Sequence, residues 1–359
     1  MRLRNTLLFG TSVLAFGLYA ASANADAVSG TLFFTTFSAQ TINGMTDSVW
    51  KVPFTFTGTT FSAPVGSIVG IANTNAAADG ITFLPDGNLA VGGRTSLNAV
   101  EVNPGGGIVN NVSAGTGSYE VVLNKLTPAG STILYNMWNG PTMGGANPFS
   151  ALTLTAGGAL GAAGVNYTVT CNGAGCSTDI RGLVWDPHNS TYYYGTAGDG
   201  LTNGDFGTAV INDAAHTIVL TPFAGHIGNT AAHGVTFDPL TNDIITSSAT
   251  AIDQFNEAGT LVSTISFTGT QFDAVGTDGK GHLFAASNFG QLGFIDYDAT
   301  GLIGAAANFS ADPFLANTLD DIAQLITPPP QTPEPASLAL LGTALVGMGL
   351  VRRRRRPMA

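Results

Sequence analysis

The sequence predicts an all-β protein with the architecture of a β-propeller. Three observations predict this: a strand–turn–strand phrase that recurs along the chain, a hairpin that follows each copy, and a composition rich in glycine with only 10% charged residues. Repeats of roughly 40–60 residues with four strands each have the size of propeller blades. A parallel β-helix or a two-sheet sandwich is the alternative, but the unequal repeat lengths argue against a solenoid with fixed rungs.

The recurring phrase is an apolar or β-branched stretch, a turn with Asp, Pro or Gly, and a second apolar stretch. Such a phrase is typical of two strands joined by a tight turn. Its copies begin at Asp79, Glu120, Arg181, His233 and Asp273. The hairpin turns that follow the copies lie at 103–106, 155–158, 212–215, 256–259 and 298–301. Each unit therefore holds two hairpins, as a four-stranded blade does.

The two ends of the body are expected to form one further blade. Strands are predicted at 31–37, 49–54 and 59–63, without a clear innermost strand, and an unpaired strand is predicted at 319–326. Placing this last strand innermost in the N-terminal unit removes two sheet edges and closes a ring. The count is then six blades, with seven as the alternative, in a domain that spans residues 26–327.

The repeat phrase, across residues 31–326, resembles the broad NHL, SMP-30 and lyase-like group of propellers. The pattern is loose, and the resemblance implies a fold without an activity. Function has to be argued from a site, because one fold carries many functions.

The N-terminus has the three parts of a secretory signal. Arg2 and Arg4 are basic, residues 7–20 are apolar, and residues 23–25 read Ala-Asn-Ala, a small-x-small cleavage site. We predict a signal peptide at residues 1–25 that signal peptidase removes, so that the body is exported. An uncleaved anchor is the alternative.

The C-terminus combines a proline-rich spacer at 328–335, an apolar segment at 336–351 and a basic tail at 352–359. The apolar segment is near the lower limit for a transmembrane helix, which usually needs about 20 residues. The arginines that follow it predict that the tail stays in the cytoplasm while the body lies outside. The alternative is a plain anchor that is never cut.

These three parts, in this order, resemble the PEP-CTERM sorting tail of Gram-negative bacteria. The matching residues are Pro333, Glu334 and Pro335 ahead of the helix and Arg352, Arg353 and Arg354 behind it. The resemblance implies that an exosortase-type membrane protease processes the protein. The protein would be tethered to the inner membrane before processing and lie at the cell surface or outside the cell afterwards. Because the family is linked to exopolysaccharide production and biofilm, the resemblance also implies an extracellular polysaccharide as partner.

The body between the two terminal signals is strongly acidic. Seven of the twelve basic residues lie in those signals, which leaves five in the body against 22 acidic residues, a net charge of about −17. This balance excludes nucleic acid as a partner, since nucleic-acid binding needs a basic surface. An acidic surface favours solubility, and it also suits contact with divalent cations or cationic polymers.

Cys171 and Cys176 are the only cysteines, and glycines lie between them. In an exported chain an even count at short spacing predicts a disulfide. A metal site is the weaker interpretation because no second Cys/His pair lies nearby in sequence, and the spacing is not that of a redox C-x-x-C motif.

The best candidate site is one mouth of the central channel. No complete catalytic signature such as G-x-S-x-G or H-E-x-x-H occurs in the chain. The first strand of each blade lines the channel, so the polar residues that begin these strands should meet at one mouth. They are Asp79, Glu120, Arg181, His233, Asp273, Asp320 and Asp321.

These residues allow two kinds of chemistry and one structural role. The candidate ligands for Ca²⁺ are Asp79, Glu120, Asp273 and Asp321. His233 is the candidate proton carrier and Arg181 the candidate clamp for an anion. The favoured interpretation is that the polar groups bind backbone and water in a wet channel with no cofactor.

Two further features are weighed and set lower. The loop from Asp199 to Asp205 resembles a Ca²⁺ loop but lacks EF-hand spacing, so an ordinary turn is expected. The other histidines, among them His188 and His282, are expected near turns or strand ends without a shared face, exposed or already hydrogen-bonded.

Two functions from different classes follow. The first is a non-catalytic surface or matrix protein whose acidic propeller binds extracellular polymer or another protein. The second is a propeller hydrolase or lyase, of the lactonase or glycan-lyase kind, that uses a divalent cation at the channel mouth. Convergence of the channel-mouth residues on one point would favour the second function.

Overall fold

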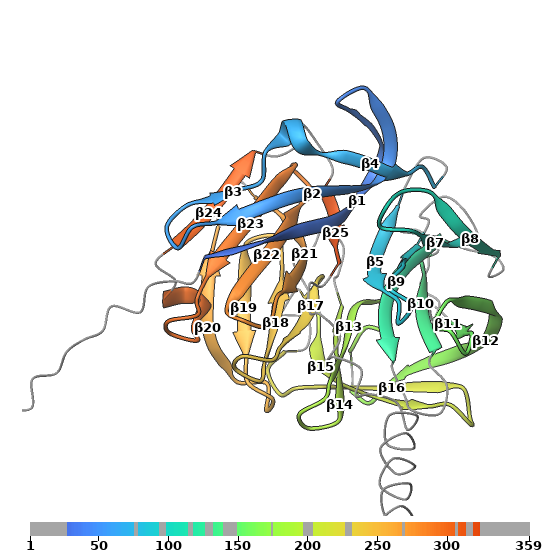
Figure 1. The fold of residues 1–359 in the computed structure, drawn as a ribbon. Helices are drawn as coiled ribbons and strands as arrows, with labels where there is room; N and C mark the ends of the chain where they lie inside the picture. The colour runs from blue at the N-terminus through green and yellow to red at the C-terminus, as the bar shows by residue number, and fades with distance from the viewer. Residues whose placement is uncertain are drawn as a thin grey trace, which may run out of the picture.

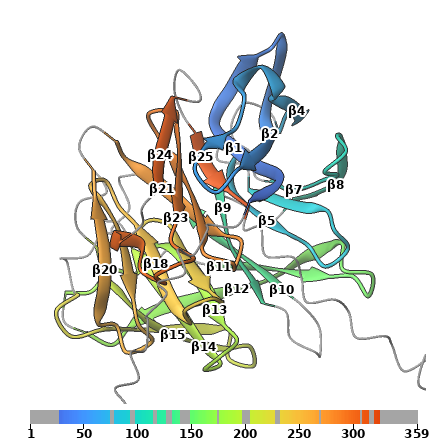
Figure 2. The ribbon, with the colours of Figure 1, turned by 60° about the vertical axis from the view of Figure 1, so that its left-hand side comes forward.

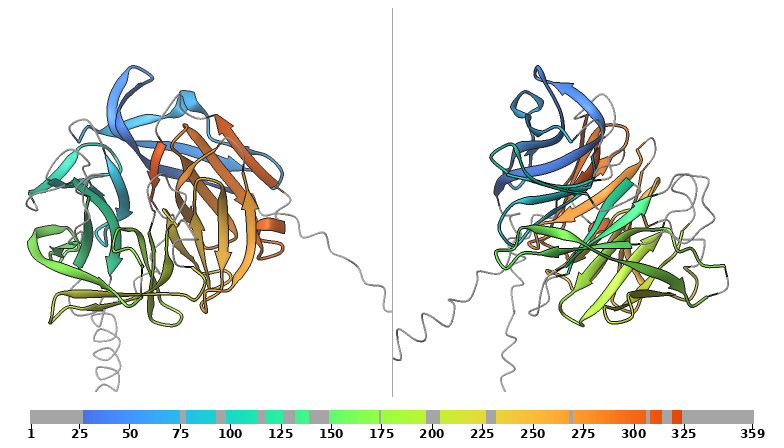
Figure 3. Two further views of the ribbon diagram at one scale, coloured as in Figure 1. Left: turned by 180° about the vertical axis from the view of Figure 1, so that it is seen from behind. Right: turned by 90° about the vertical axis from the view of Figure 1, so that its right-hand side faces the viewer.

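The sheets of the protein stand around a central axis, with their innermost strands near the axis and the others farther out (Figures 1 and 3). The computed structural model describes residues 27–74, 78–92, 98–113, 118–125, 132–138, 149–173, 175–196, 204–226, 232–267, 270–305, 308–313 and 319–323. Within these ranges the helical elements are two short 3₁₀ turns, η1 (Val65–Ser67) and η3 (Ile303–Ala305). The predicted all-β, propeller-like class is confirmed.

The first sheet joins the two ends of the body, with its strands in the order β25-β1-β2-β3 and β4 paired to β2. Its strands are β1 (Val28–Ile42), β2 (Met45–Phe56), β3 (Phe61–Ser62), β4 (Val69–Ala72) and β25 (Leu319–Ile322). Three N-terminal strands were expected and four are found, because the chain after β3 returns through η1 and pairs again with β2.

The C-terminal strand closes this sheet as predicted. β25 pairs antiparallel with β1, with Phe34 opposite Ile322 and Thr36 opposite Leu319. The backbone N–H of Ala323 extends the ladder by donating to the carbonyl of Phe33 at 2.9 Å. Figure 2 shows β25 beside β1, at the edge of the first sheet that faces the last sheet. The strand was predicted to continue to residue 326, and residues 324–326 lie outside the described part of the chain.

Three further sheets are four-stranded antiparallel meanders in chain order. The sheet that follows the N-terminal strands holds β5 (Asp79–Phe83), β6 (Leu89–Gly92), β7 (Asn98–Val102) and β8 (Ile108–Ser113). The next holds β17 (Val235–Asp238), β18 (Asp243–Ser247), β19 (Ala251–Phe255) and β20 (Leu261–Ser266). The last holds β21 (Phe272–Thr277), β22 (His282–Ser287), β23 (Gln291–Asp296) and β24 (Asn308–Pro313).

The fifth sheet has eight strands and consists of two such meanders joined at their outer edges. The first meander is β9 (Ser118–Lys125), β10 (Thr132–Trp138), β11 (Phe149–Leu154) and β12 (Leu160–Cys171). The second is β13 (Ile180–Asp186), β14 (Thr191–Thr196), β15 (Phe206–Asn212) and β16 (Thr217–Pro222). The long strand β12 joins them by pairing parallel with β16 over 168–171 and 217–220.

The innermost strands form a closed series of neighbours. In order around the axis, β5, β9, β13, β17, β21 and β25 each contact the next, and β25 contacts β5 again. The same circle of strands is visible from the front and from behind (Figures 1 and 3). These strands bring the starts of the repeated units together at the axis.

Apolar side chains fill the space between neighbouring sheets. Between the first and the last sheet, the ring of Phe61 stacks on Phe294 with centroids 4.4 Å apart, and Phe56 lies 4.8 Å from Phe294. Phe54 contacts Phe284 edge-on at 4.9 Å. Alternation along each strand directs these rings into the interface, and each buried ring contributes about 1.5–3 kcal/mol of hydrophobic stabilisation.

The two terminal signals lie outside the described residues. They are the predicted signal peptide at 1–25, the spacer at 328–335, the apolar helix at 336–351 and the basic tail at 352–359. Within the described ranges, no helix has the length and apolar character needed to cross a membrane.

Candidate functional site

Five of the seven predicted channel-mouth residues interact with one another, because each stands at or just before the start of an innermost strand. Asp79 begins β5, and Arg181, Asp273 and Asp320 are second in β13, β21 and β25. His233 lies just before β17 and is tied to β18 by its backbone N–H, which donates to the Ser247 carbonyl at 2.8 Å.

Two of these side chains form a close pair. Nδ1 of His233 lies 2.7 Å from Oδ1 of Asp273 and 3.2 Å from the carbonyl oxygen of the same residue. Both side chains are largely buried, with 12% and 6% of their surfaces exposed. When His233 is protonated, it forms with the carboxylate of Asp273 an ion pair that water screens only weakly.

A glycine makes this pair possible. At Gly234 an added Cβ would lie 2.8 Å from Cα of Ala274 and 2.9 Å from the carbonyl oxygen of Asp273. Only a residue without a side chain lets β17 approach β21 so closely. Gly182 has the same role against the carbonyl oxygen of His233, at 2.9 Å. In the Arg-Gly and His-Gly dipeptides of the repeat, the first residue thus places a polar side chain at the mouth. The glycine that follows lets the neighbouring blade approach closely.

The C-terminal strand brings a third acid into the cluster. Asp320 is 2% exposed, and its side chain hydrogen-bonds to Asp273. Burial, the nearby charge of Asp79 and then that of Asp273 raise the pKa of Asp320 well above its usual range. Burial and the neighbouring acids therefore favour the protonated form of Asp320.

Asp273 has the opposite tendency. Burial by itself would raise the pKa of Asp273, but the charge and hydrogen bond of His233, the hydrogen bond from Asp320 and the charge of Arg181 together lower it. The two acids share one hydrogen bond in which Asp320 is the donor and Asp273 the acceptor. Neighbouring carboxyls that titrate in opposite directions are a common feature of functional sites and also of structural networks.

Arg181 is oriented from its own side of the mouth. Its Nε and one terminal nitrogen lie 3.2 and 3.0 Å from Oδ2 of Asp179. The backbone N–H of Asp179 donates to Oγ of Ser177, and the N–H of Ser177 donates to the buried carboxylate of Asp205. The guanidinium therefore reaches the mouth at the end of an ordered chain of contacts.

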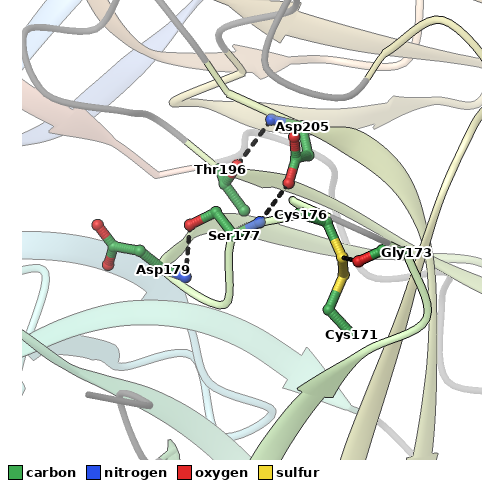
Figure 4. Close-up of a disulfide and its surroundings, with 7 residues drawn as sticks. All are labelled: Cys171, Gly173, Cys176, Ser177, Asp179, Thr196 and Asp205. Carbon is green, nitrogen blue, oxygen red and sulfur yellow. Dashed lines mark hydrogen bonds between the residues drawn. A yellow bond between two sulfur atoms is a disulfide. The ribbon is translucent and has the colours of Figure 1, made fainter. Parts of the chain in front are cut away.

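That chain begins at a disulfide. Cys171 and Cys176 are bonded, with Cα atoms 6.3 Å apart, at the end of β12. Figure 4 shows the short loop that they close and the contacts that run from it through Ser177 to Asp179 and Asp205. The disulfide thus fixes the segment that positions Asp179, and through Asp179 the side chain of Arg181.

The structure describes fewer side-chain contacts for the other predicted residues, which are Asp321, Glu120 and the loop at 199–205. Asp321 is half-buried, and its backbone N–H donates to Oγ1 of Thr35 at 3.0 Å. Glu120 lies in β9 beside β5 and β13, and its side chain lies outside the described part of the structure. In the predicted Ca²⁺ loop, residues 199–203 are also outside it, while Asp205 serves the hydrogen bond to Ser177.

The three predicted Ca²⁺ ligands whose side chains are described do not form a compact group of metal ligands. Among the described residues, the group of three ligand-type side chains whose atoms lie within 4.8 Å of one another is His282, Asp296 and Asp298. Asp79, Asp273 and Asp321 form no such group, and the side chain of Glu120 is not described. The Ca²⁺ site at the channel mouth remains a prediction.

His282 lies at a strand end, as expected, and its Nδ1 is hydrogen-bonded to Asp278. The sequence did not indicate that the residue is 1% exposed, with its Nε2 buried without a hydrogen-bond partner among the described residues. Strand pairing within the blade could have indicated this environment. The start of the second strand lies opposite the end of the third, which places His282 opposite Asp296.

Comparison with known proteins identifies the C-terminal segment. Residues 331–356 match the model of the PEP-CTERM protein-sorting motif. The chain carries a PEP-CTERM sorting motif. This motif marks export and membrane-anchored sorting before processing by an exosortase, which is a membrane protease. No curated protein matches the chain in sequence.

Several solved structures are similar to this chain in fold. A protein of unknown function from Bacteroides caccae is 11% identical, with 82% of this chain and 98% of that one covered and a TM-score of 0.47. Virginiamycin B lyase from Staphylococcus aureus is 10% identical, with 80% and 89% covered and a TM-score of 0.46. A putative 6-phosphogluconolactonase from Bacteroides uniformis is 13% identical, with 78% and 82% covered and a TM-score of 0.45.

Proposed function

We propose that this protein is exported, cut by an exosortase at its PEP-CTERM tail, and displayed at the cell surface or released as an acidic six-bladed propeller that binds extracellular polysaccharide without transforming it. The observation that carries the sorting half is the motif at residues 331–356. The observation that carries the binding half is a buried, unpaired carboxyl oxygen at the channel mouth.

The six-blade count is supported by the closed series of innermost strands. Six strands, one from each meander and one from the sheet that joins the chain ends, contact one another in a ring. The eight-stranded sheet counts as two blades in this proposal, because β9 and β13 both lie in the ring and the parallel β12–β16 pair joins only their outer edges. The count of seven that the sequence left open is not needed to close this circle.

The proposal that the channel mouth binds polysaccharide rests first on Asp320. Its Oδ2 atom is buried and has no hydrogen-bond partner among the described residues. A buried polar atom without a partner costs about 1–3 kcal/mol, so such atoms are usually met by water or by a ligand. In this proposal a bound water supplies the donor for this buried oxygen and links it to a hydroxyl-rich polymer, whose hydroxyls also hydrogen-bond to the neighbouring carboxylates of Asp79 and Asp273.

The charged groups of the mouth are mostly engaged with one another. His233 pairs with Asp273, Arg181 with Asp179, and Asp320 with Asp273. Mutual pairing favours a preorganised binding surface, since a ligand meets groups that are already fixed in place.

The sorting half is tested in a Gram-negative host with and without an exosortase. The exported full chain should lose its C-terminal segment only when the exosortase is present, which mass spectrometry of the mature protein would detect. Glu334→Ala should leave the segment attached. Pro329→Ala changes the neighbouring proline run outside the matched residues and should be cut like the parent. Equal masses in both hosts would reject this half of the proposal.

The binding half is tested with two substitutions at opposite ends of one strand. Asp79 begins β5 at the mouth, and Asp86 lies in the turn that follows β5 at the far end. Asp79→Asn should weaken binding of the purified protein to the host's extracellular polysaccharide roughly 10- to 150-fold, because one charge-assisted hydrogen bond contributes about 1.5–3 kcal/mol. Asp86→Asn should leave binding unchanged. Equal binding by both variants would place the contact elsewhere, and capture of a protein in place of the polymer would also contradict the proposal.

A propeller hydrolase or lyase is the second candidate, and one observation favours it. His233 and Asp273 form a buried pair beside Asp320, whose pKa is raised, and near Arg181. His233 would carry the proton, Asp273 would orient the imidazole, and Arg181 would neutralise a developing anion. Turnover of lactones or uronate-containing glycans that is abolished in His233→Gln, with unchanged thermal stability, would establish this alternative.

A further inference from the structure

We propose that His282, Asp296 and Asp298 form a binding site for one divalent transition-metal cation, with Zn²⁺ as the probe of choice. The site lies at the end of the β21–β24 sheet away from the channel mouth. Asp273 stands at the start of β21, whereas His282 follows the turn at its other end. The proposal therefore does not depend on the function assigned to the mouth.

Strand pairing brings the three ligands together. His282 begins β22 and lies directly opposite Asp296, the last residue of β23. Asp298 follows two residues later in the turn. One ligand atom from each residue lies within 4.8 Å of the others, and Nε2 of His282 is 4.0 Å from Oδ1 of Asp296. Ligand atoms around a tetrahedral Zn²⁺ lie roughly 3.4 Å apart, because each bond is about 2.0–2.2 Å long. Small side-chain rotations would supply the difference.

The imidazole presents a buried nitrogen to the two carboxylates. His282 is 1% exposed, and its Nε2 has no hydrogen-bond partner among the described residues. Burying a polar nitrogen without a partner is unfavourable. A cation held between this nitrogen and the carboxylates of Asp296 and Asp298 satisfies it and removes the repulsion between the two acids.

The opposite nitrogen of the ring is fixed by a fourth acid. Nδ1 of His282 lies 2.7 Å from Oδ2 of Asp278. Oδ1 of Asp278 accepts the backbone N–H groups of Lys280 at 2.8 Å and of His282 at 3.2 Å. This carboxylate therefore holds the proton on Nδ1 and leaves the lone pair on Nε2. A carboxylate–histidine–metal arrangement of this kind orients metal-binding histidines and makes them more basic.

The backbone is shaped to bring the two turns into contact. Gly281 has φ +97°, and a Cβ at this position would lie 2.4 Å from Cα of Asp298. The carbonyl of Gly281 accepts the N–H of Tyr297 at 2.8 Å. Only glycine tolerates this conformation and this close approach, so Gly281 allows Asp298 to lie beside His282.

The surroundings suit a metal site with one open side. The rings of Phe56 and Phe294 lie 5.8 Å from the imidazole and shield it from water. Asp298 is only half-buried, which leaves a path for the ion and room for a water ligand. One nitrogen and two carboxylates are a donor set that Zn²⁺ and similar divalent ions accept.

The arrangement is specific to this sheet. In the neighbouring β17–β20 sheet the residue that begins the second strand is Asp243, whose carboxylate accepts a hydrogen bond from Nε2 of Gln254 at 2.7 Å. In that sheet a hydrogen-bond partner of the aspartate is an amide side chain, and no histidine begins the second strand. The repeat therefore does not require a His–Asp–Asp group, and the group in the last sheet calls for its own explanation.

The test measures Zn²⁺ binding by isothermal titration calorimetry on purified full-length protein freed of metal with a chelator. The expected result is one Zn²⁺ per chain. Asp298→Asn should weaken binding at least tenfold, and Asp278→Asn should weaken it 10- to 100-fold, as loss of a carboxylate behind a metal-binding histidine typically does. Glu257→Gln is the matched control, because Glu257 contacts His188 in the adjacent sheet but lies outside the group; it should bind like the parent.

Three outcomes would overturn the proposal. One is no uptake of Zn²⁺ by the folded parent protein, which would leave His282 as a purely structural group. Another is unchanged affinity in Asp298→Asn. The third is binding that survives in Asp298→Asn and disappears in Asp320→Asn, which would place the ion at the channel mouth. Asp298 lies in a partly exposed turn, so this variant tests the site even if substitutions of His282 prevent folding.

Discussion

At the scale of single residues, the channel mouth is governed by the unequal titration of two acids. Burial and acidic neighbours raise the pKa of Asp320, while His233, Asp320 and Arg181 lower the pKa of Asp273. One acid thus donates the hydrogen bond that the other accepts. The hydrogen bond between the two acids reduces the repulsion among the carboxyls of Asp79, Asp273 and Asp320. It thereby helps to hold β25 against β21.

Asp320→Asn tests this assignment through the dependence of stability on pH. A carboxyl whose pKa is raised in the folded state stabilises the protein below its unfolded pKa and loses that contribution as the pH rises through the folded pKa. The parent protein should therefore lose stability relative to Asp320→Asn as the pH rises above about 4. Thermal unfolding of both proteins from pH 4 to 9 measures the difference. A difference in melting temperature that does not change with pH would contradict the assignment.

Gly234→Ala tests the close approach of the blades. The new methyl group would overlap Oγ of Ser247 and the backbone of Ala274. We expect a loss of about 1–3 kcal/mol of stability, the usual effect of overpacking. Gly66→Ala is the control, because nothing lies within 4 Å of a Cβ there, and its effect should stay within about 0.5 kcal/mol. Urea unfolding of the three proteins gives the comparison, and equal stability of the two variants would exclude a packing role for Gly234.

The sequence could predict the mouth residues but not the second cluster, for a physical reason. Asp79, Arg181, His233 and Asp273 share one position in a repeated phrase, so a common place in the fold follows from the repeat. His282, Asp296 and Asp298 occupy three different positions within a single unit. Their proximity depends on the register of β22 and β23 and on the left-handed backbone of Gly281, neither of which is a property of the repeat.

At the scale of elements, the turns decide the register of each blade. The Gly-bearing turns expected at 103–106, 155–158 and 256–259 each close with a backbone hydrogen bond from the glycine to the first residue of the turn. Local signals of this kind are readable because they act within four residues. The parallel pairing of β12 with β16 was not foreseen, since it joins strands of two units whose edges show no marker in the sequence.

The disulfide beside this parallel pair has an expected effect on stability. Its two cysteines are five positions apart, and closing so short a loop stabilises a protein by about 2 kcal/mol in the chain-entropy model. The double variant Cys171→Ser/Cys176→Ser should lose about that amount in urea unfolding. If the loop also positions Asp179, hydrogen exchange at Ser177 and Asp179 should become faster in the variant. Unchanged exchange there would separate the disulfide from the orientation of Arg181.

At the scale of the whole molecule, the strand from the C-terminus is what makes the body a ring. β25 belongs to the sheet of β1, touches β5 and β21, and carries Asp320 into the mouth. It also stands only a few residues before the spacer that leads to the sorting motif. The matched motif begins at residue 331, after β25 has ended at Ile322, so a cut within the motif would remove no strand of the ring that the structure describes.

Truncation at two points tests this division of the chain. Ending the chain at residue 332 removes the sorting segment and should leave the melting temperature unchanged, since no described strand is lost. Ending it at residue 318 also removes β25, whose Leu319 and Ile322 are buried. Loss of these two side chains should cost about 3–6 kcal/mol, a large share of the 5–15 kcal/mol that is typical of folded proteins. We expect the shorter chain to unfold at much lower urea concentration and to expose β1 as a free edge that promotes association. Equal stability of the two truncated chains would show that the ring does not depend on its closing strand.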